Sequence, residues 1–269
     1  MLVLKSRLEN IINKTLSCFL FGGMIVKKLI ALILICIITF FIYHYTRPGL
    51  NLVSLGDSLA AGTNAHQTTK FGYSDFVRTY LEEAGLLRSY NKSFAIPAYR
   101  STELLRDIKN NKTKEIDGKT VSIQNVIHDS DILLISIGVN DLFYKLGVKE
   151  HGLSLIREDR IYEYIDQVIE DINALYEEIN KYARNQVIVI GYYNPLSRYR
   201  NNEFTSAITY ANKELKKLAT KHGFDFIDTY HLFKNNPNFL PNPADIHPGN
   251  EGYRAIAKLI IAQIRRNIN

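Results

Sequence analysis

From residue 51 onward, short continuous apolar runs alternate with longer stretches of helical periodicity. The runs lack an apolar–polar alternation, which is typical of strands buried on both faces of a sheet. Strands that alternate with helices favour an α/β domain with a parallel sheet and right-handed crossovers. We therefore predict one domain over 49–269, with an exposed polar loop at 110–120. The predicted strands are 51–55, 92–96, 131–137, 186–191 and 224–228, and the predicted helices are 72–85, 101–110, 121–128, 157–184, 202–222 and 249–267.

The positive charge of the chain is concentrated ahead of this domain. The formal net charge is +6, and residues 1–47 contribute +5 of it. Nucleic-acid binding needs a basic surface on the folded domain, so this distribution argues against a nucleic-acid partner. Both cysteines, Cys18 and Cys36, also lie in the N-terminal segment. The domain itself therefore has no disulfide framework and no thiolate metal site.

An apolar run over residues 29–43 precedes the domain. Its 15 residues are fewer than the roughly 20 that span a bilayer. Residues 44–46 extend the run, and they include a tyrosine, which is favoured at the membrane interface. No small-residue cleavage site follows, so we predict an uncleaved transmembrane signal anchor over 29–46. A cleaved signal peptide and a buried core helix are the alternatives.

Two lysines, Lys27 and Lys28, stand directly before the apolar run. Basic residues stay on the cytoplasmic side of a membrane, so residues 1–28 are predicted to be cytoplasmic and the domain extracellular. Cleavage of the anchor would release a secreted domain. Met24 opens a sequence that resembles an ordinary signal start, and translation beginning there is an alternative for this segment.

Small and polar residues follow the predicted strands, where a parallel sheet binds its ligands. Taken singly, Ser58 reads as a helix cap, Asn140 as part of a turn and His247 as the entry to a helix. Their joint occurrence, in order and at strand ends, is poorly explained in those terms. The four stretches are Gly-Asp-Ser-Leu at 56–59, Pro-Ala-Tyr-Arg-Ser at 97–101, Gly-Val-Asn-Asp at 138–141 and Asp-Ile-His-Pro at 245–248.

One kind of chemistry uses all of these residue types. A serine hydroxyl is a weak nucleophile that needs an adjacent base, and histidine serves as that base near neutral pH. The histidine needs a partner that holds its tautomer and stabilises the imidazolium. The oxyanion of the tetrahedral intermediate needs fixed donors, such as backbone N–H groups and an asparagine amide. The set favours acyl transfer through a serine nucleophile.

Two other motifs do not fit the first stretch. A phosphate-binding loop has the pattern G-x-x-x-x-G-K-[ST]. The spacing from Gly56 to Gly62 is one residue too long for it, and Thr63 stands where the lysine belongs. The nucleophile elbow of the α/β-hydrolases is G-x-S-x-G. Ala60 occupies the last position of that pattern here.

The combined motifs resemble those of the GDSL or SGNH hydrolases, over residues of about 50–265. The N-terminal anchor and layout are similar to the bacterial lysophospholipase-like lipase/esterase branch. The resemblance implies a flavodoxin-like three-layer α/β/α fold with a five-stranded parallel sheet, and ester hydrolysis without a metal or cofactor. By motif matching, Ser58 is the nucleophile and one oxyanion donor, Asn140 is another donor, and His247 is the general base.

Two positions depart from the family pattern. The family usually has a glycine where Ala98 aligns, and the amide of that residue donates to the oxyanion. If the position requires a positive φ, an alanine there costs roughly 1 kcal/mol. The family acid commonly stands three residues before the histidine, where this chain has Ala244. We expect Asp245, two residues before, to orient His247; a backbone carbonyl in that role is the alternative.

The leading expectation is an extracytoplasmic serine esterase or lipase that hydrolyses a lysophospholipid or another lipid ester. An O-acetyl esterase acting on cell-wall or exopolysaccharide glycans is the alternative substrate class. A binding module without catalysis and a nucleotide- or flavin-binding protein are the other functional classes. Aromatic residues near the strand ends are candidates for the walls of an acyl pocket. These aromatics are Tyr73, Tyr99, Phe143, Tyr144, Tyr192 and Tyr193.

Overall fold

The chain divides into two units, Met1–Pro48 and Gly49–Asn269. In the first unit, residues 26–39 form a helix with exposed side chains. Within the described part of the chain, no helix is both long and apolar enough to cross a membrane. Residues 40–46 of the predicted anchor, and most of 1–28, lie outside the described residues. The computed structural model describes residues 23, 26–39, 49–69, 71–147, 160–195 and 202–268.

The second unit is built on a five-stranded sheet with the order β2-β1-β5-β6-β7, in which every neighbouring pair is parallel. The predicted α/β class and five-stranded parallel sheet are therefore confirmed. From β1, the chain continues to β2 on one side and later to β5 on the other side. The strand order therefore reverses at β1, and parallel sheets of this kind bind ligands at such a reversal. The strands are β1 (Leu50–Gly56), β2 (Leu87–Asn91), β5 (Ile132–Ser136), β6 (Gln186–Ile190) and β7 (Asp225–Ile227).

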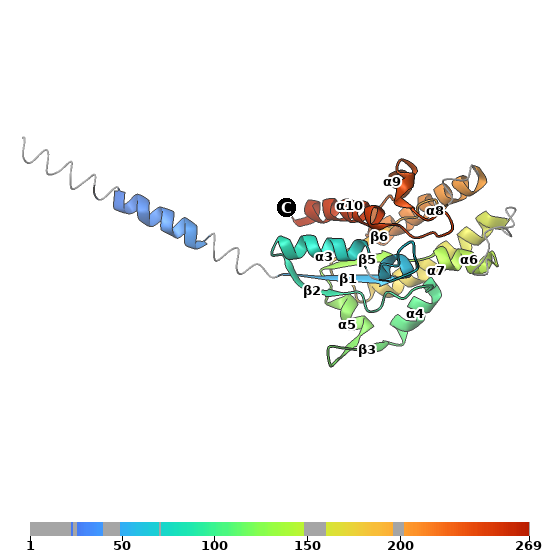
Figure 1. The fold of residues 1–269 in the computed structure, drawn as a ribbon. Coiled ribbons are helices and arrows are strands. Elements are labelled where there is room, and N and C mark those ends of the chain that lie inside the picture. Colours follow the sequence, from blue (N-terminus) through green and yellow to red (C-terminus); the bar gives the residue numbers. More distant parts are fainter. Residues whose placement is uncertain are drawn as a thin grey trace, which may run out of the picture. The chain divides into compact units, whose positions relative to one another are not determined.

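Helices cover both faces of this sheet and make three layers (Figure 1). Successive strand residues point to opposite faces, and β5 shows the consequence. Ile132 and Leu134 pack in the cluster that includes α3 and α10, whereas Leu133 and Ile135 pack in the cluster that includes α4, α5, α7 and α8. The helices are α3 (Tyr73–Glu83), α4 (Ser101–Lys109), α5 (Ile123–His128), α7 (Ile161–Asn180), α8 (Asn202–Lys221) and α10 (Asn250–Ile268).

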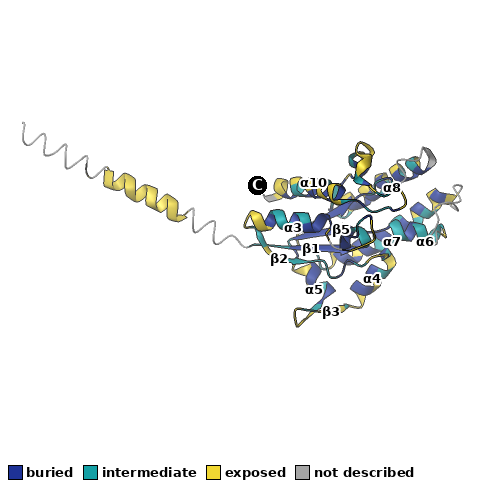
Figure 2. Cartoon of the chain, viewed as in Figure 1, coloured by how far each residue is buried: buried dark blue, intermediate teal, exposed yellow. Residues whose placement is uncertain are grey.

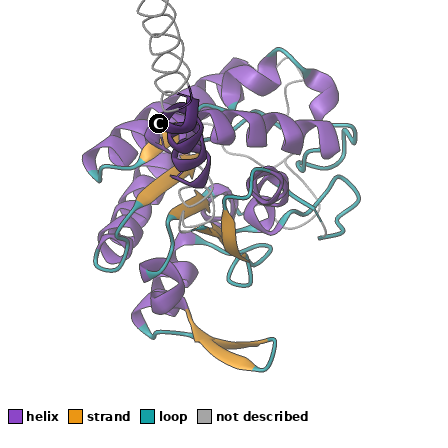
Figure 3. Cartoon of the chain, turned by 90° about the vertical axis from the view of Figure 1, so that its left-hand side faces the viewer, coloured by secondary structure: helices purple, strands orange, loops and turns teal. Residues whose placement is uncertain are grey.

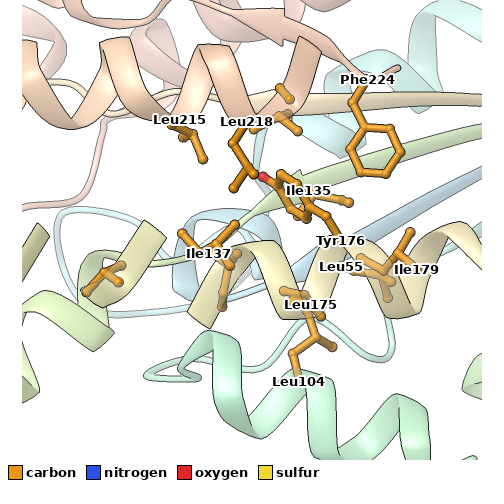
Figure 4. Close-up of a cluster of buried hydrophobic side chains, with 14 of the residues drawn as sticks. Leu55, Leu104, Ile135, Ile137, Leu175, Tyr176, Ile179, Leu215, Leu218 and Phe224 are labelled. Atoms are coloured by element: carbon orange, nitrogen blue, oxygen red, sulfur yellow. The ribbon is translucent and has the colours of Figure 1, made fainter. Parts of the chain in front are cut away.

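The larger of the two apolar clusters lies between the sheet and the helices of one face (Figure 4). Leu55 and Ile135 from the sheet meet Leu104 of α4, Leu175 of α7 and Leu215 of α8, and none of the five is more than 1% exposed. Burying each such side chain contributes about 1.5–3 kcal/mol. The outward faces of the helices are exposed (Figure 2), so the apolar periodicity of the sequence matches the layers.

The prediction of a strand at 92–96 is wrong. The edge strand is β2, whose burial is only partial and whose sequence, Leu-Arg-Ser-Tyr-Asn, has no apolar run. The apolar residues that follow belong to a turn, in which Phe94 is 1% exposed and packs into the core. Ala95 makes only an isolated parallel bridge with Gly56. Burial of the turn produced the apolar pattern that a strand would also produce.

Other elements were not predicted. The polar segment 110–120 contains most of a hairpin, formed by β3 (Thr113–Ile116) and β4 (Lys119–Ser122), which extends from the body of the domain (Figure 3). A two-stranded hairpin with mostly exposed side chains has no apolar signature. Short helices also follow the strand ends. They are α2 (Ser58–Ala61), α6 (Val139–Lys145), α9 (Tyr230–Lys234) and a 3₁₀ turn (Pro237–Phe239).

Candidate active site

A glycine at the end of β1 aims the chain into the site. Gly56 has a φ of +130°, and a Cβ atom there would lie 1.8 Å from the carbonyl oxygen of Ser136. Only glycine fits this close approach. The Asp57 carboxylate then accepts a hydrogen bond of 3.0 Å from the Leu59 amide and caps α2. Ser58 therefore opens α2 at the carboxyl edge of the sheet.

The structure brings Ser58, His247 and Asp245 together in one chain of hydrogen bonds. Oγ of Ser58 lies 2.8 Å from Nε2 of His247, and Nδ1 of His247 lies 2.7 Å from Oδ1 of Asp245. With the proton on Nδ1, the imidazole donates to the carboxylate and Nε2 accepts from the serine hydroxyl. The segment that carries His247 is held by Tyr193, whose hydroxyl donates to the Ile246 carbonyl at 2.6 Å.

A tight turn explains how Asp245 reaches the imidazole from two residues away. Its Oδ1 accepts from the backbone N–H of His247 at 2.7 Å as well as from the ring. Aspartate favours this kind of turn, in which its carboxylate accepts a hydrogen bond from the backbone amide two residues further along the chain. Burial alone would raise the pKa of Asp245, but the His247 amide, the nearby imidazole and Gln67 outweigh it and hold the pKa below its ordinary value. The carboxylate is therefore ionised.

Gln67 is a site residue that sequence reasoning missed. Its Nε2 donates to Oδ2 of Asp245 at 3.1 Å, across 178 residues of sequence. Its backbone adopts a φ of +58°. The same loop is joined to the acid's segment by Asn242, whose side chain donates to the Ala65 carbonyl at 3.0 Å. A glutamine in a polar loop carries no local signal for this role, because the contact is set by the approach of two distant loops.

Two further candidate donors lie beyond β2 and β5. Ala98 has a φ of +64°, the left-handed conformation that favours glycine. Its amide has no hydrogen-bond partner within the described residues. Asn140 donates one Nδ2 hydrogen to the Tyr99 carbonyl at 2.9 Å, which ties its amide to the segment of Ala98. The second Nδ2 hydrogen has no partner among the residues that the structure describes and could be donated to a ligand.

Asp141 joins the same two segments more firmly. Its carboxylate accepts from the backbone N–H of Ser101 at 2.9 Å and from the Ser101 hydroxyl at 2.5 Å. The side chain thus satisfies an amide at the start of α4 while it belongs to α6. Burial raises the pKa of Asp141, and the two bonds from Ser101 oppose this rise.

Asp57 lies next to the serine but takes no part in the hydrogen-bond chain to His247. Burial raises its pKa to about 7, and the negative charge of Asp141 adds to the rise. The amide of Leu59 opposes it, because a hydrogen bond to the carboxylate favours the charged form. This carboxyl therefore supports the turn that presents Ser58 and titrates near neutral pH.

A cavity opens directly over Ser58 and His247. Its volume is about 620 Å³ with open solvent included, and it runs between α6 and the start of α8. Phe143, Tyr192 and Tyr193 line it. The other three candidate aromatics lie elsewhere: Tyr73 is buried in the core, Tyr144 is 69% exposed, and Tyr99 donates to Asp107 at 2.6 Å. No group of three potential metal ligands occurs among the described residues.

Solved structures share this fold. A lipase from a goat rumen metagenome matches with a TM-score of 0.63 and 21% identity, over 79% of this chain and 96% of the lipase. An acetylxylan esterase from Geobacillus stearothermophilus matches with a TM-score of 0.58 and 18% identity, over 80% and 94% of the two chains. No curated protein sequence matches. The model of the GDSL-like lipase/acylhydrolase family matches residues 54–255. The chain belongs to this family, and it is a serine hydrolase that acts on ester bonds.

Proposed function

We propose that this protein is an extracytoplasmic serine esterase that hydrolyses lipid esters, such as lysophospholipids, through an acyl-enzyme on Ser58. The observation that carries the proposal is the continuous hydrogen-bond chain from Ser58 through His247 to Asp245. A serine, its base and the partner of the base stand in the order that nucleophilic acyl transfer requires.

The geometry supports a two-step reaction. Oγ of Ser58 attacks the ester carbonyl carbon while Nε2 of His247 takes the hydroxyl proton, and Asp245 stabilises the imidazolium. The amides of Ser58 and Ala98 and the free Nδ2 hydrogen of Asn140 donate to the oxyanion. The intermediate collapses, Nε2 returns the proton to the leaving alcohol, and the acyl group stays on Ser58. Water, deprotonated by Nε2 of His247, then attacks the acyl carbon, and the imidazolium returns this proton to Oγ of Ser58 as the carboxylic acid leaves.

The composition of the cavity supports a lipid acyl group over an acetyl group. Beyond the catalytic residues its wall is mainly apolar, with Leu142, Phe204 and Ile208 among its members. Apolar walls gain free energy from each methylene that leaves water. Glycan recognition instead relies on polar groups placed to bind hydroxyls. An esterase for O-acetyl groups on glycans would use the same catalytic residues, and it is the second candidate.

The N-terminal sequence supports a position at the membrane surface. Lys27 and Lys28 precede the apolar run 29–43, and the order of charge and apolar residues is that of a signal anchor. An anchored domain on the outer side of the membrane would meet lipid esters at high local concentration. Flotation of the full chain with lipid vesicles tests this part of the proposal, and a chain that stays entirely unbound contradicts it.

The decisive test compares the full chain with Ser58→Ala and His247→Gln on nitrophenyl esters from acetyl to palmitoyl. Each substitution removes a group that acts as a unit with the others, so kcat should fall by a factor of about 10⁴ or more. Ser89→Ala, on the exposed edge strand β2, is the matched serine control and should retain activity. A chain-length optimum at acetyl would favour the glycan esterase, and residual activity of Ser58→Ala equal to wild type would refute the nucleophile.

A further inference from the structure

A second cavity adjoins the one that contains Ser58. It is a narrow space between α6, α7 and α8: its volume is about 410 Å³ with open solvent included, but only about 20 Å³ of it can hold the centre of a water-sized sphere. Neither Ser58 nor His247 lines it. The two cavities share five lining residues, so they adjoin each other at these side chains. The shared residues are Val139, Leu142, Tyr192, Phe204 and Ile208.

The lining of the second cavity is apolar. Its far end is formed by Ile165 and Val168 of α7 and by Ala207 and Ala211 of α8. The one side-chain hydroxyl in the lining, that of Tyr192, donates to the Ile137 carbonyl at 2.9 Å. Among the described lining residues, no other side chain has a polar atom. A sugar or a charged headgroup would lose its hydration here without gaining hydrogen bonds in return.

Small residues on α8 keep this space open. Ala207 and Ala211 are four positions apart, on one face of the helix, and they are 1% and 5% exposed. A larger side chain at either position would reduce the gap between α8 and α7. An unfilled apolar space lowers the stability of the fold. A use for the space in function explains why a gap beside the catalytic serine persists.

We infer that the second cavity binds the distal part of an aliphatic acyl chain carried by Ser58, and that Ala207 and Ala211 set the chain length the enzyme accepts. The inference rests on the proposed function of Ser58 as the nucleophile. The chain passes Leu142 and Ile208 and ends between α7 and α8. The alcohol part of the ester leaves from the first cavity, whose wall contains His247.

Chain-length profiles of the full chain test this inference. Each methylene buried in an apolar site raises kcat/KM by up to about fourfold. We therefore expect wild-type kcat/KM on nitrophenyl esters to rise beyond butyrate. Ala211→Leu shortens the site, and the ratio of kcat/KM for octanoate to that for acetate should fall at least tenfold. Ala211→Val is the milder variant if the leucine does not fit. Ile165→Val widens the far end and should shift the optimum to longer chains.

Controls separate this effect from general damage. Ala219→Val changes another buried alanine of α8 that lies outside both cavities, and it should leave the octanoate-to-acetate ratio at the wild-type value. Thermal unfolding reports whether each variant is folded. Ala211→Leu adds three carbons to a narrow gap and should lower the Tm somewhat, whereas Ala211→Val should change the Tm less. The expected result is a loss of long-chain activity in variants that remain folded at the assay temperature. An unchanged ratio in folded Ala211→Leu and Ala211→Val overturns the inference.

Binding without chemistry distinguishes failure of the acyl site from failure of the nucleophile. Calorimetric titration of Ser58→Ala with acetate, hexanoate and decanoate should show affinity that grows with chain length. In the double variant Ser58→Ala/Ala211→Leu, the affinity for decanoate should fall more than the affinity for the shorter carboxylates. If this dependence holds while Ser58→Ala retains esterase activity, the acyl site stands and the nucleophile is wrong. Equal affinity for all three carboxylates overturns the acyl site itself.

Discussion

Residue 98 is an alanine in a conformation that favours glycine. Its φ of +64° brings Cβ close to a neighbouring carbonyl, so Ala98→Gly should raise the free energy of unfolding by about 1 kcal/mol. Urea unfolding measures this. Ala95→Gly is the control: Ala95 is buried and lacks a positive φ, so its substitution should lower stability. Equal losses in the two variants would show that residue 98 is unstrained.

Gln67 should matter through the charge of Asp245. Gln67→Ala removes the donor to Oδ2, so the carboxylate is held less firmly and kcat should fall severalfold. Gln67→Glu keeps the size but sets two carboxylates side by side, so its kcat relative to wild type at the same pH should fall further as the pH rises from 5 to 7 and the new acid ionises. Profiles of kcat against pH measure both effects, with Thr68→Ala, in the same exposed loop, as control. Two variants with wild-type profiles would contradict this role.

Asp57 makes the stability of the domain depend on pH. Its pKa is about 7 in the folded state, compared with an ordinary value of 3.8, which we take for the unfolded chain. Between these values the folded state holds a proton that the unfolded state has released, so the free energy of unfolding falls as the pH rises. Asp57→Asn removes this titration and keeps an oxygen for the Leu59 amide. Between pH 4 and pH 8, the wild type should lose up to about 4 kcal/mol relative to the variant. Parallel curves from urea unfolding would contradict a raised pKa.

At the level of the helices, the Asp141 carboxylate of α6 accepts hydrogen bonds from Ser101 at the start of α4. Asp141→Ala leaves the Ser101 amide without its acceptor and loosens the segment that holds Asn140. Loss of the buried hydrogen bonds between Asp141 and Ser101 should lower the free energy of unfolding by about 1–3 kcal/mol and lower kcat as well. Urea unfolding and kcat on a short ester measure the two losses.

Glu103→Ala is the matched control for that variant. Glu103 accepts from the Arg100 amide at the start of the same helix, and no contact of it with α6 is seen in the described part of the chain. This substitution should cost some stability and leave kcat near the wild-type value. If both variants lost kcat equally, the link to α6 would have no special part in catalysis.

At the scale of the whole molecule, the sheet, both clusters and the candidate site all belong to Gly49–Asn269. We expect a protein made of these residues alone to fold and to match the full chain in kcat/KM on a soluble short ester. Circular dichroism and ester assays check this. The two proteins should differ in binding to lipid vesicles, which only the full chain should show. An unfolded fragment would mean that the N-terminal unit contributes to the core.

The class of fold and the residue types of the site could be predicted from the amino-acid sequence alone. Buried parallel strands need continuous apolar runs and their helices need an apolar stripe, so local periodicity was enough to predict β1, β5, β6 and β7. The motifs at the strand ends were equally local. They named Ser58, Asn140, Asp245 and His247 as candidates because chemistry restricts which residue types can do this work, and the resemblance to the GDSL hydrolases added Ala98.

The tertiary structure alone decided which of these groups meet. Edge strand β2 and the β3–β4 hairpin were not predicted because exposed strands have little apolar pattern. The buried turn at Phe94 was predicted as a strand because its residues are apolar. Gln67 reaches Asp245 across 178 residues, and the cavity between α6, α7 and α8 exists only where three helices pack imperfectly. Such features depend on how distant segments approach each other, and no local pattern of residues encodes that approach.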